Sequence, residues 1–306
     1  MSFLKKIFGT KNPEEQESKK IKNTIQTLKF DGLKALKMGK IDHAEAFFNK
    51  VLEYNEDDID ALLHLSQIYI RTHELDVAKQ HMTKVAELAP QLIEARLNLA
   101  QICQFKKDYL EMLDAANEAI TIDSENAIAH YLQGVAYYGQ KDKFNAIASL
   151  TRAIAINNYY TEALLLRAKI LISMQEYNEA IKDLNQIMER EKDQEDALLL
   201  LSEIYEYQKD FEQASHIYSK ITELNPFNTK AYIQLSELLI KTNKIEKALI
   251  VLDEAIELNP TIADLYQNRG KAKLVLGDKE GALEDTKKAL ELDPSKKEQF
   301  SGEFKN

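Results

Sequence analysis

Apolar residues recur along the chain at the spacing of a helix that has one buried face. In residues 245–258, Ile245, Ala248, Leu252 and Ala255 fall on one helical face, and charged residues occupy the opposite face. A second helical stretch, residues 231–240, precedes this one and is separated from it by a short polar segment. Asn259 and Pro260 follow, and proline cannot continue a helix. The pattern predicts a unit of helix, short turn, helix and stop.

This unit recurs every 34 residues without a gap. Counted from 1 to 34 within a unit, position 8 is always Gly, Ala or Ser, and position 20 is Ala in every unit except the third, which has Met112. Small residues at these positions allow the two helices of a unit to approach closely. The eight units occupy residues 25–58, 59–92, 93–126, 127–160, 161–194, 195–228, 229–262 and 263–296.

The period, the small positions and a proline at position 32 in half of the units resemble the tetratricopeptide repeat. The chain departs from the family pattern in having no Trp, in Met112, and in Lys143 followed by Phe144 where one aromatic residue is expected a residue earlier. The resemblance implies an all-α solenoid, in which eight helix pairs stack into a right-handed superhelix and the first helices line a concave groove. Residues 1–24 would then be a separate basic segment, and residues 297–306 a short C-terminal cap.

Two units share a charge correlation that the others lack. Arg167 and Arg269 stand at position 7, and Asp183 and Asp285 stand at position 23 of the same units. These positions can face each other across an antiparallel helix pair. We expect the ion pairs Arg167–Asp183 and Arg269–Asp285, although coincidence on exposed faces would give the same correlation.

Composition narrows the classes of function. The net charge of −10 disfavours general nucleic-acid binding, and no apolar run is long enough to span a membrane. Cys103 is the only cysteine, which suits a reducing compartment and a cytoplasmic protein. The sequence has no metal-binding motif and no glycine-rich phosphate loop, so we expect no enzyme, no metal and no cofactor.

The resemblance places positions 2, 5, 6 and 9 of each first helix on the concave face. Position 5 is apolar through six consecutive units, position 6 is leucine in the fourth to sixth, and carboxylates border them. This suits an unknown protein or peptide that is apolar with basic flanks. Position 5 has the alternative role of packing between adjacent units. The candidate groove residues are Tyr131, Leu132, Leu165, Leu166, Lys169, Leu199, Leu200, Glu203 and Glu237.

One known type of groove is not expected. Family members that bind acidic chaperone tails use a clamp of lysine, asparagine and arginine side chains on successive first helices. Here Lys29 is followed by Leu33 in place of asparagine, and the next units offer His64 and Glu94. The chain is therefore not expected to be a carboxylate-clamp protein.

The N-terminal segment carries a second signal. Residues 1–24 hold six Lys and three Glu, and an apolar face is flanked by lysines. The segment has neither the apolar core of a secretory signal nor the second-position glycine of a myristoylated protein. It could lie on an anionic membrane, fold back on Leu28 and Phe30, or have no fixed structure. The candidate membrane contacts are Phe3, Leu4, Lys5, Lys6, Ile7 and Phe8.

These observations favour a cytoplasmic interaction scaffold that binds a peptide or protein segment in its groove. Two other functions stay open at this point. One is a membrane-surface assembly factor anchored by residues 3–8, and the other is a regulatory subunit whose catalytic partner is another chain.

Overall fold

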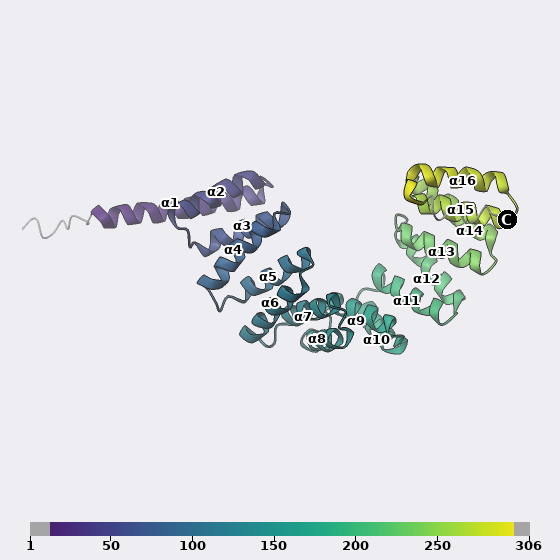
Figure 1. Ribbon diagram of the computed structural model, residues 1–306, viewed down its shortest axis with the longest axis horizontal. Coiled ribbons are helices and arrows are strands. Elements are labelled where there is room, and N and C mark those ends of the chain that lie inside the picture. The colour runs from purple at the N-terminus through teal and green to yellow at the C-terminus, as the bar shows by residue number, and fades with distance from the viewer. Residues whose placement is uncertain (1–12, 297–306) are drawn as a thin grey trace, which may run out of the picture. The chain divides into compact units, whose positions relative to one another are not determined.

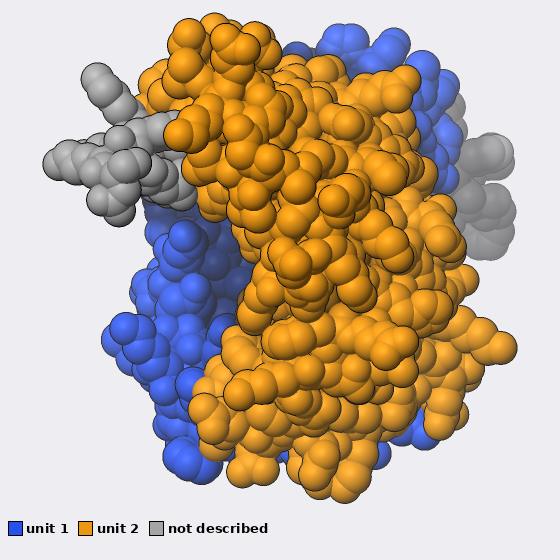
Figure 2. Space-filling model, turned by 90° about the vertical axis from the view of Figure 1, so that its right-hand side faces the viewer, with its two compact units in different colours: residues 1–158 blue, residues 159–306 orange. Residues whose placement is uncertain are grey.

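The computed structural model describes residues 13–296, which contain sixteen α-helices, a short 3₁₀ helix and no β-strand (Figure 1). The chain divides into two compact units, residues 1–158 (unit 1) and 159–306 (unit 2), which Figure 2 colours separately. The helices of unit 1 are α1 (Pro13–Lys37), α2 (Ile41–Tyr54), α3 (Ile59–Arg71), α4 (Leu75–Leu88), α5 (Ile93–Lys106), α6 (Tyr109–Ile122), α7 (Ala127–Gly139) and α8 (Lys143–Ile156). Those of unit 2 are α9 (Thr161–Ser173), α10 (Tyr177–Met188), α11 (Glu195–Tyr207), α12 (Phe211–Leu224), α13 (Thr229–Lys241), α14 (Ile245–Leu258), α15 (Ala263–Val275), α16 (Lys279–Leu292) and the 3₁₀ helix η2 (Pro294–Lys296).

The helix boundaries follow the 34-residue period. From α3 onward, every odd-numbered helix begins at the first residue of a predicted repeat, from Ile59 in α3 to Ala263 in α15. The predicted all-α repeat architecture is therefore confirmed. The N-terminal boundary is different, because α1 begins at Pro13 and runs without a break past Ile25. Proline is well suited to a first helical position, and Glu14 and Glu15 in the first turn favour a helix start there.

The two helices of each repeat meet at the small residues predicted for this contact. In the second repeat Ser66 and Ala78 are fully buried, and the Ser66 hydroxyl donates a hydrogen bond to the Ala78 carbonyl at 3.0 Å. In the fourth repeat a Cβ atom added to Gly134 would lie 2.8 Å from the side chain of Leu150, which is too close. A larger residue at position 8 would therefore push the helices apart.

Neighbouring repeats within a unit share their cores. In unit 2, Tyr232 of α13, Leu252 of α14 and Leu265 of α15 belong to one buried cluster, so a single core joins the seventh repeat to the eighth. Helices α13 and α15 also contact each other directly, as do α5 and α7 in unit 1. Each helix pair thus covers an apolar face that the next pair would otherwise expose to water.

The turn inside each repeat requires one residue in the left-handed backbone region. That residue is always position 15, and only two of the eight are glycine. The eight are Gly39 (φ 70), His73 (φ 64), Lys107 (φ 57), Lys141 (φ 65), Gln175 (φ 65), Lys209 (φ 63), Asn243 (φ 59) and Gly277 (φ 85). Left-handed geometry costs a residue with a Cβ about 1 kcal/mol or more, so most of these turns store strain.

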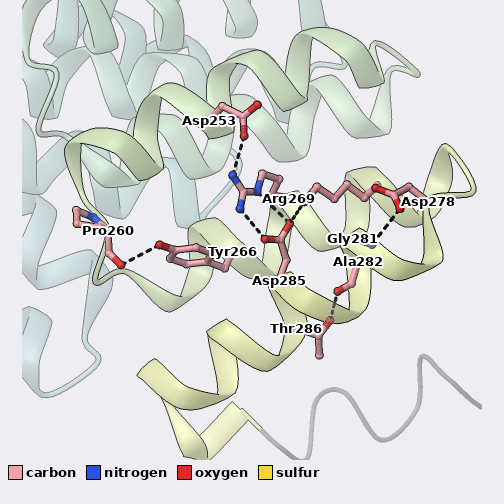
Figure 3. Close-up of polar contacts among 10 residues, drawn as sticks. Asp253, Pro260, Tyr266, Arg269, Asp278, Gly281, Ala282, Asp285 and Thr286 are labelled. Carbon is pink, nitrogen blue, oxygen red and sulfur yellow. Dashed lines mark hydrogen bonds and ion pairs between the residues drawn. The ribbon is translucent and has the colours of Figure 1, made fainter.

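Both arginine–aspartate contacts expected from the sequence occur within their repeats. The Arg167 guanidinium donates to both Asp183 carboxylate oxygens, at 2.9 and 2.6 Å, and Asp183 is 3% exposed. Arg269 binds Asp285 with the same geometry, at 2.9 and 2.6 Å (Figure 3).

The Arg269 pair extends into a network that joins two repeats. Arg269 also donates to Asp253 of the preceding repeat at 2.7 Å (Figure 3). The Lys273 ammonium lies 2.8 Å from Asp285. The hydrogen bonds from Arg269 to Asp285 raise the pKa of the guanidinium against the opposing effect of burial. The buried carboxylate of Asp285 thus has two cationic partners.

We expect Lys209→Gly to raise the free energy of unfolding of unit 2 by about 0.5–1 kcal/mol, because glycine removes the left-handed strain. Gly277→Ala should lower this free energy by about 1 kcal/mol, because a Cβ there meets no atom within 4 Å and only backbone strain changes. Urea unfolding followed by circular dichroism measures both. Loss of stability in Lys209→Gly would contradict the assignment of strain.

We expect Asp183→Ala to destabilise unit 2 by about 3 kcal/mol, because it leaves the partly buried Arg167 without its carboxylate partner. Glu179→Ala on the same helix is the matched control. It breaks an exposed pair with Lys182, so its effect should stay within about 0.5 kcal/mol. Thermal unfolding of both variants separates the two cases, and equal shifts would show that the Arg167–Asp183 pair is not a buried structural contact.

Candidate functional site

A cleft of about 410 Å³ lies in unit 2 between the first helices of the sixth and seventh repeats. Its residues come from α11, α13 and the intervening helix α12. The lining residues are Leu199, Glu203, Glu206, Tyr207, Tyr218, Lys230, Gln234 and Lys241.

Helical periodicity explains why these residues meet. In α11, Glu203 lies four residues after Leu199, and Glu206 and Tyr207 lie three and four residues after Glu203, so the four side chains share one side of the helix. Lys230 and Gln234 of α13 are four residues apart and share a face in the same way. The cleft therefore has one wall from each of two successive first helices.

Tyr218 and Glu206 form the floor of the cleft. The Tyr218 hydroxyl donates a hydrogen bond to Glu206 Oε1 at 2.7 Å, and the residue is 2% exposed. Burial raises the pKa of Tyr218, and the adjacent Glu206 carboxylate adds to the shift. Tyr218 is therefore a neutral donor that fixes the orientation of Glu206.

Tyr207 and Glu203 form the outer part of the α11 wall. The Tyr207 hydroxyl donates to Glu203 Oε1 at 3.4 Å, and 57% of the residue is exposed. Its ring stacks on that of Tyr177 with the centroids 5.7 Å apart. The negative charge of Glu203, followed by burial, raises the pKa of Tyr207. This wall combines an exposed aromatic ring with carboxylates, which is a suitable setting for a cation.

The facing α13 wall is basic. Lys241 lies with its ammonium 4.6 Å from the centroid of the Phe211 ring, which holds it beside the cleft. Lys230 is exposed and forms no ion pair with another described residue. Gln234 lies on the same helix, between Lys230 and Lys241 in the sequence, and offers both a donor and an acceptor. The cleft is thus acidic on one side and basic on the other.

The structure distributes the predicted groove residues over both units. Tyr131 and Leu132 belong to unit 1, and the other seven belong to unit 2. Leu165, Leu166 and Leu200 are partly exposed, and Lys169 and Glu237 are exposed. Glu203 and Leu199 line the cleft, but Leu199 is only 9% exposed, which agrees with a packing role at position 5.

Leu132 does not lie on an accessible surface. It is 2% exposed, so the prediction that it lines the groove is wrong. Position 6 of the fourth repeat is enclosed by neighbouring side chains, whereas the same position leaves Leu166 and Leu200 partly open. Burial at this position therefore varies between repeats, and the period alone does not reveal it.

Several cleft residues were not among those predicted from the sequence. Glu206 and Tyr207 stand at positions 12 and 13, one helical turn beyond the last position considered. Lys230 and Gln234 stand at considered positions but are neither apolar nor acidic. Extending the concave face by one turn would have found Glu206, Tyr207 and Lys241.

Three further expectations from the sequence concern a membrane contact, a metal site and the single cysteine. Phe3, Leu4, Lys5, Lys6, Ile7 and Phe8 lie outside the described residues. Between residues 13 and 296 there is no group of metal-binding side chains, and no helix is long and apolar enough to cross a membrane. Cys103 is buried, and burial raises the pKa of its thiol to about 11, which disfavours a reactive thiolate.

Family models described as tetratricopeptide repeat match most of the chain. One matches residues 35–91, 145–204, 171–232 and 205–274, a second matches residues 93–126 and 263–296, and a third matches residues 129–156. The chain therefore belongs to the tetratricopeptide repeat family, as the sequence predicted. Proteins of this family are repeat scaffolds for binding other proteins or peptides and are in general not enzymes.

Solved structures share the fold at low sequence identity. A tetratricopeptide repeat protein from Parabacteroides merdae is 20% identical over 77% of this chain and 93% of its own, with a TM-score of 0.60. PilF from Pseudomonas aeruginosa is 18% identical over 69% of this chain and 96% of its own, with a TM-score of 0.58. MamA is 22% identical over 55% of this chain and 92% of its own, with a TM-score of 0.51. A comparison with curated proteins gave no match.

We expect Glu203→Gln to lower the pKa of Tyr207 toward its ordinary value, because the neighbouring negative charge is the main cause of the shift. NMR titration of ring-labelled tyrosine measures this. Tyr232 is the internal control: burial and Glu254 raise its pKa to about 12, and neither changes in the variant. An unchanged Tyr207 titration would show that Glu203 does not lie against its ring.

Proposed function

We propose that the chain is an interaction scaffold whose unit 2 binds a peptide segment with apolar and basic side chains in the α11–α13 cleft. The supporting observation is the α11 wall, where Glu203 and Glu206 flank the exposed ring of Tyr207. A ligand lysine or arginine can stack on this ring while its charge faces the carboxylates. Because the ring already rests on Tyr177, little side-chain freedom is lost on binding.

Apolar contacts of the ligand fall on the neighbouring first helices. Leu166 of α9 and Leu200 of α11 are partly exposed at position 6, and α9 contacts α11. An apolar ligand side chain placed there buries surface that the free protein leaves in water, at about 25 cal/mol per Å². This provides affinity that the charged contacts alone do not.

The basic wall favours one orientation of the bound peptide. Lys230 and Lys241 lie opposite Glu203 and Glu206, so an acidic residue or a backbone carbonyl of the ligand is favoured on the α13 side. Gln234 can hydrogen-bond the ligand backbone between them, as an extended segment requires. Opposite charges on the two walls disfavour the reversed orientation.

Selection from a random peptide library with the full chain should enrich sequences that place lysine or arginine near large apolar residues. Glu203→Lys should weaken binding of the selected peptides by about tenfold or more, because it replaces an attraction with a repulsion at the aromatic ring. Glu257→Lys makes the same charge change at an exposed site on α14 and should have little effect. Fluorescence anisotropy gives the affinities.

The double variant Leu166→Glu, Leu200→Glu should also lose the selected peptides, because it places two charges where apolar ligand side chains would bind. Circular dichroism must first show an unchanged helix content and melting temperature. A folded double variant that binds as tightly as the wild type would refute the apolar part of the groove. Selected peptides without basic residues would refute the role of Glu203 and Glu206.

A further inference from the structure

The start of the array has the opposite charge to the rest of the chain. Between residues 19 and 40 there are seven lysines and one aspartate, although the whole chain carries a net charge of −10. Most of these residues belong to α1, whose first turns extend beyond the end of α2 (Figure 1). Residues 14–23 are all exposed. Packing within the first repeat does not account for this excess of lysines.

The lysines share a helix face with two exposed apolar side chains. Helical spacing places Lys22, Phe30, Leu33 and Lys37 on the same side of α1. Phe30 is 66% exposed and Leu33 is 40% exposed. Since the buried residues of α1, such as Gly32 and Ala35, lie on another side, this face takes no part in the core.

A cleft of about 200 Å³ opens beside this face, between α1 and α3. Leu36, Lys37, Gln67, Ile68 and Arg71 line it. Lys37 and Arg71 are both exposed, and neither forms an ion pair with a described residue. Two cations without a carboxylate partner therefore converge on one cleft, with the Gln67 amide as a further donor.

Lys29, in the same helix, already has carboxylate partners within the protein. Its ammonium lies 2.7 Å from Asp58 and 2.8 Å from Asp60. Burial alone would lower its pKa, but the hydrogen bonds to these carboxylates outweigh that effect and raise it. Lys29 is thus neutralised within the protein, and the capacity to bind an external anion lies at Lys37 and Arg71.

We propose that this basic patch, formed by Lys22, Phe30, Leu33, Lys37 and Arg71, docks an acidic linear segment of another protein. Carboxylates of the segment bind Lys37 and Arg71 in the α1–α3 cleft, and an apolar side chain packs on Phe30 and Leu33. The patch belongs entirely to unit 1 and is independent of the proposed cleft in unit 2. The chain would then hold two ligands of opposite charge.

The surroundings of the patch favour a peptide over a lipid surface. Lys37 and Arg71 lie in a cleft between two helices, which an extended chain can enter and a flat bilayer cannot. Glu14, Glu15 and Glu17 are exposed at the start of the same helix, where an anionic membrane would repel them.

The test uses the full chain and a fluorescein-labelled peptide built of Glu-Glu-Phe-Glu-Glu-Leu blocks, followed by fluorescence anisotropy. Lys37→Glu combined with Arg71→Glu should weaken binding by about tenfold or more, and added salt should weaken wild-type binding. Phe30→Gln combined with Leu33→Gln should weaken it by about threefold or more. Because all four side chains are exposed or partly exposed, these variants should remain folded.

Matched controls distinguish binding at the patch from a general effect of charge or of exposed apolar residues. Lys50→Glu with Lys192→Glu makes the same charge change elsewhere, and Phe227→Gln with Ile250→Gln removes two other exposed apolar residues; both should bind as the wild type. Wild-type binding no tighter than that of a peptide with lysine for glutamate would overturn the proposal. So would equal losses in patch and control variants. Binding of phosphatidylserine vesicles that displaces the peptide would assign the patch to a membrane instead.

Discussion

Close contact between the two helices of each repeat is the constraint on which the rest of the structure depends. Only a residue as small as Ser66 or Gly134 fits where the first helix crosses the second, and alanine faces it in seven of the eight repeats. One such pair cannot bury enough apolar surface to offset the entropy of ordering its chain. Neighbouring pairs therefore share a core, such as the one that contains Tyr232, Leu252 and Leu265. Each helix pair is stable only when it packs against the next pair.

Most of the residues that hold the helices together are distinct from those exposed on the first helices. The small residues and the shared core hold the helices, whereas the exposed residues of the first helices take little part in that packing. They are acidic and aromatic on α11, basic on the facing side of α13, and basic with exposed apolar residues on α1. Different repeats can therefore present different chemistry on one repeated backbone. The repeated backbone is common to the family, whereas these exposed side chains are particular to each repeat.

Two further features affect the stability of the array, namely strained turns and buried ion pairs. Six turns place a residue other than glycine in the left-handed region, so local strain is tolerated wherever the surrounding helices fix the turn. The buried carboxylates of Asp183 and Asp285 are each held by an arginine of the same repeat, and Arg269 reaches Asp253 of the repeat before it. These ion pairs add directional contacts where apolar packing alone would allow the helices to slide.

The sequence by itself determined the period, the helix starts from Ile59 onward, the small contact positions and the pairing of Arg167 with Asp183 and of Arg269 with Asp285. These features are local or repeat at a fixed interval, so one chain displays them many times. The tertiary structure decided which side chains of the first helices are accessible to solvent. It buried Leu132 while leaving Leu200 partly open, and it placed Lys37 and Arg71 in one cleft. It also extended α1 back to Pro13. Exposure depends on how much neighbouring helices cover a side chain, which periodicity does not encode.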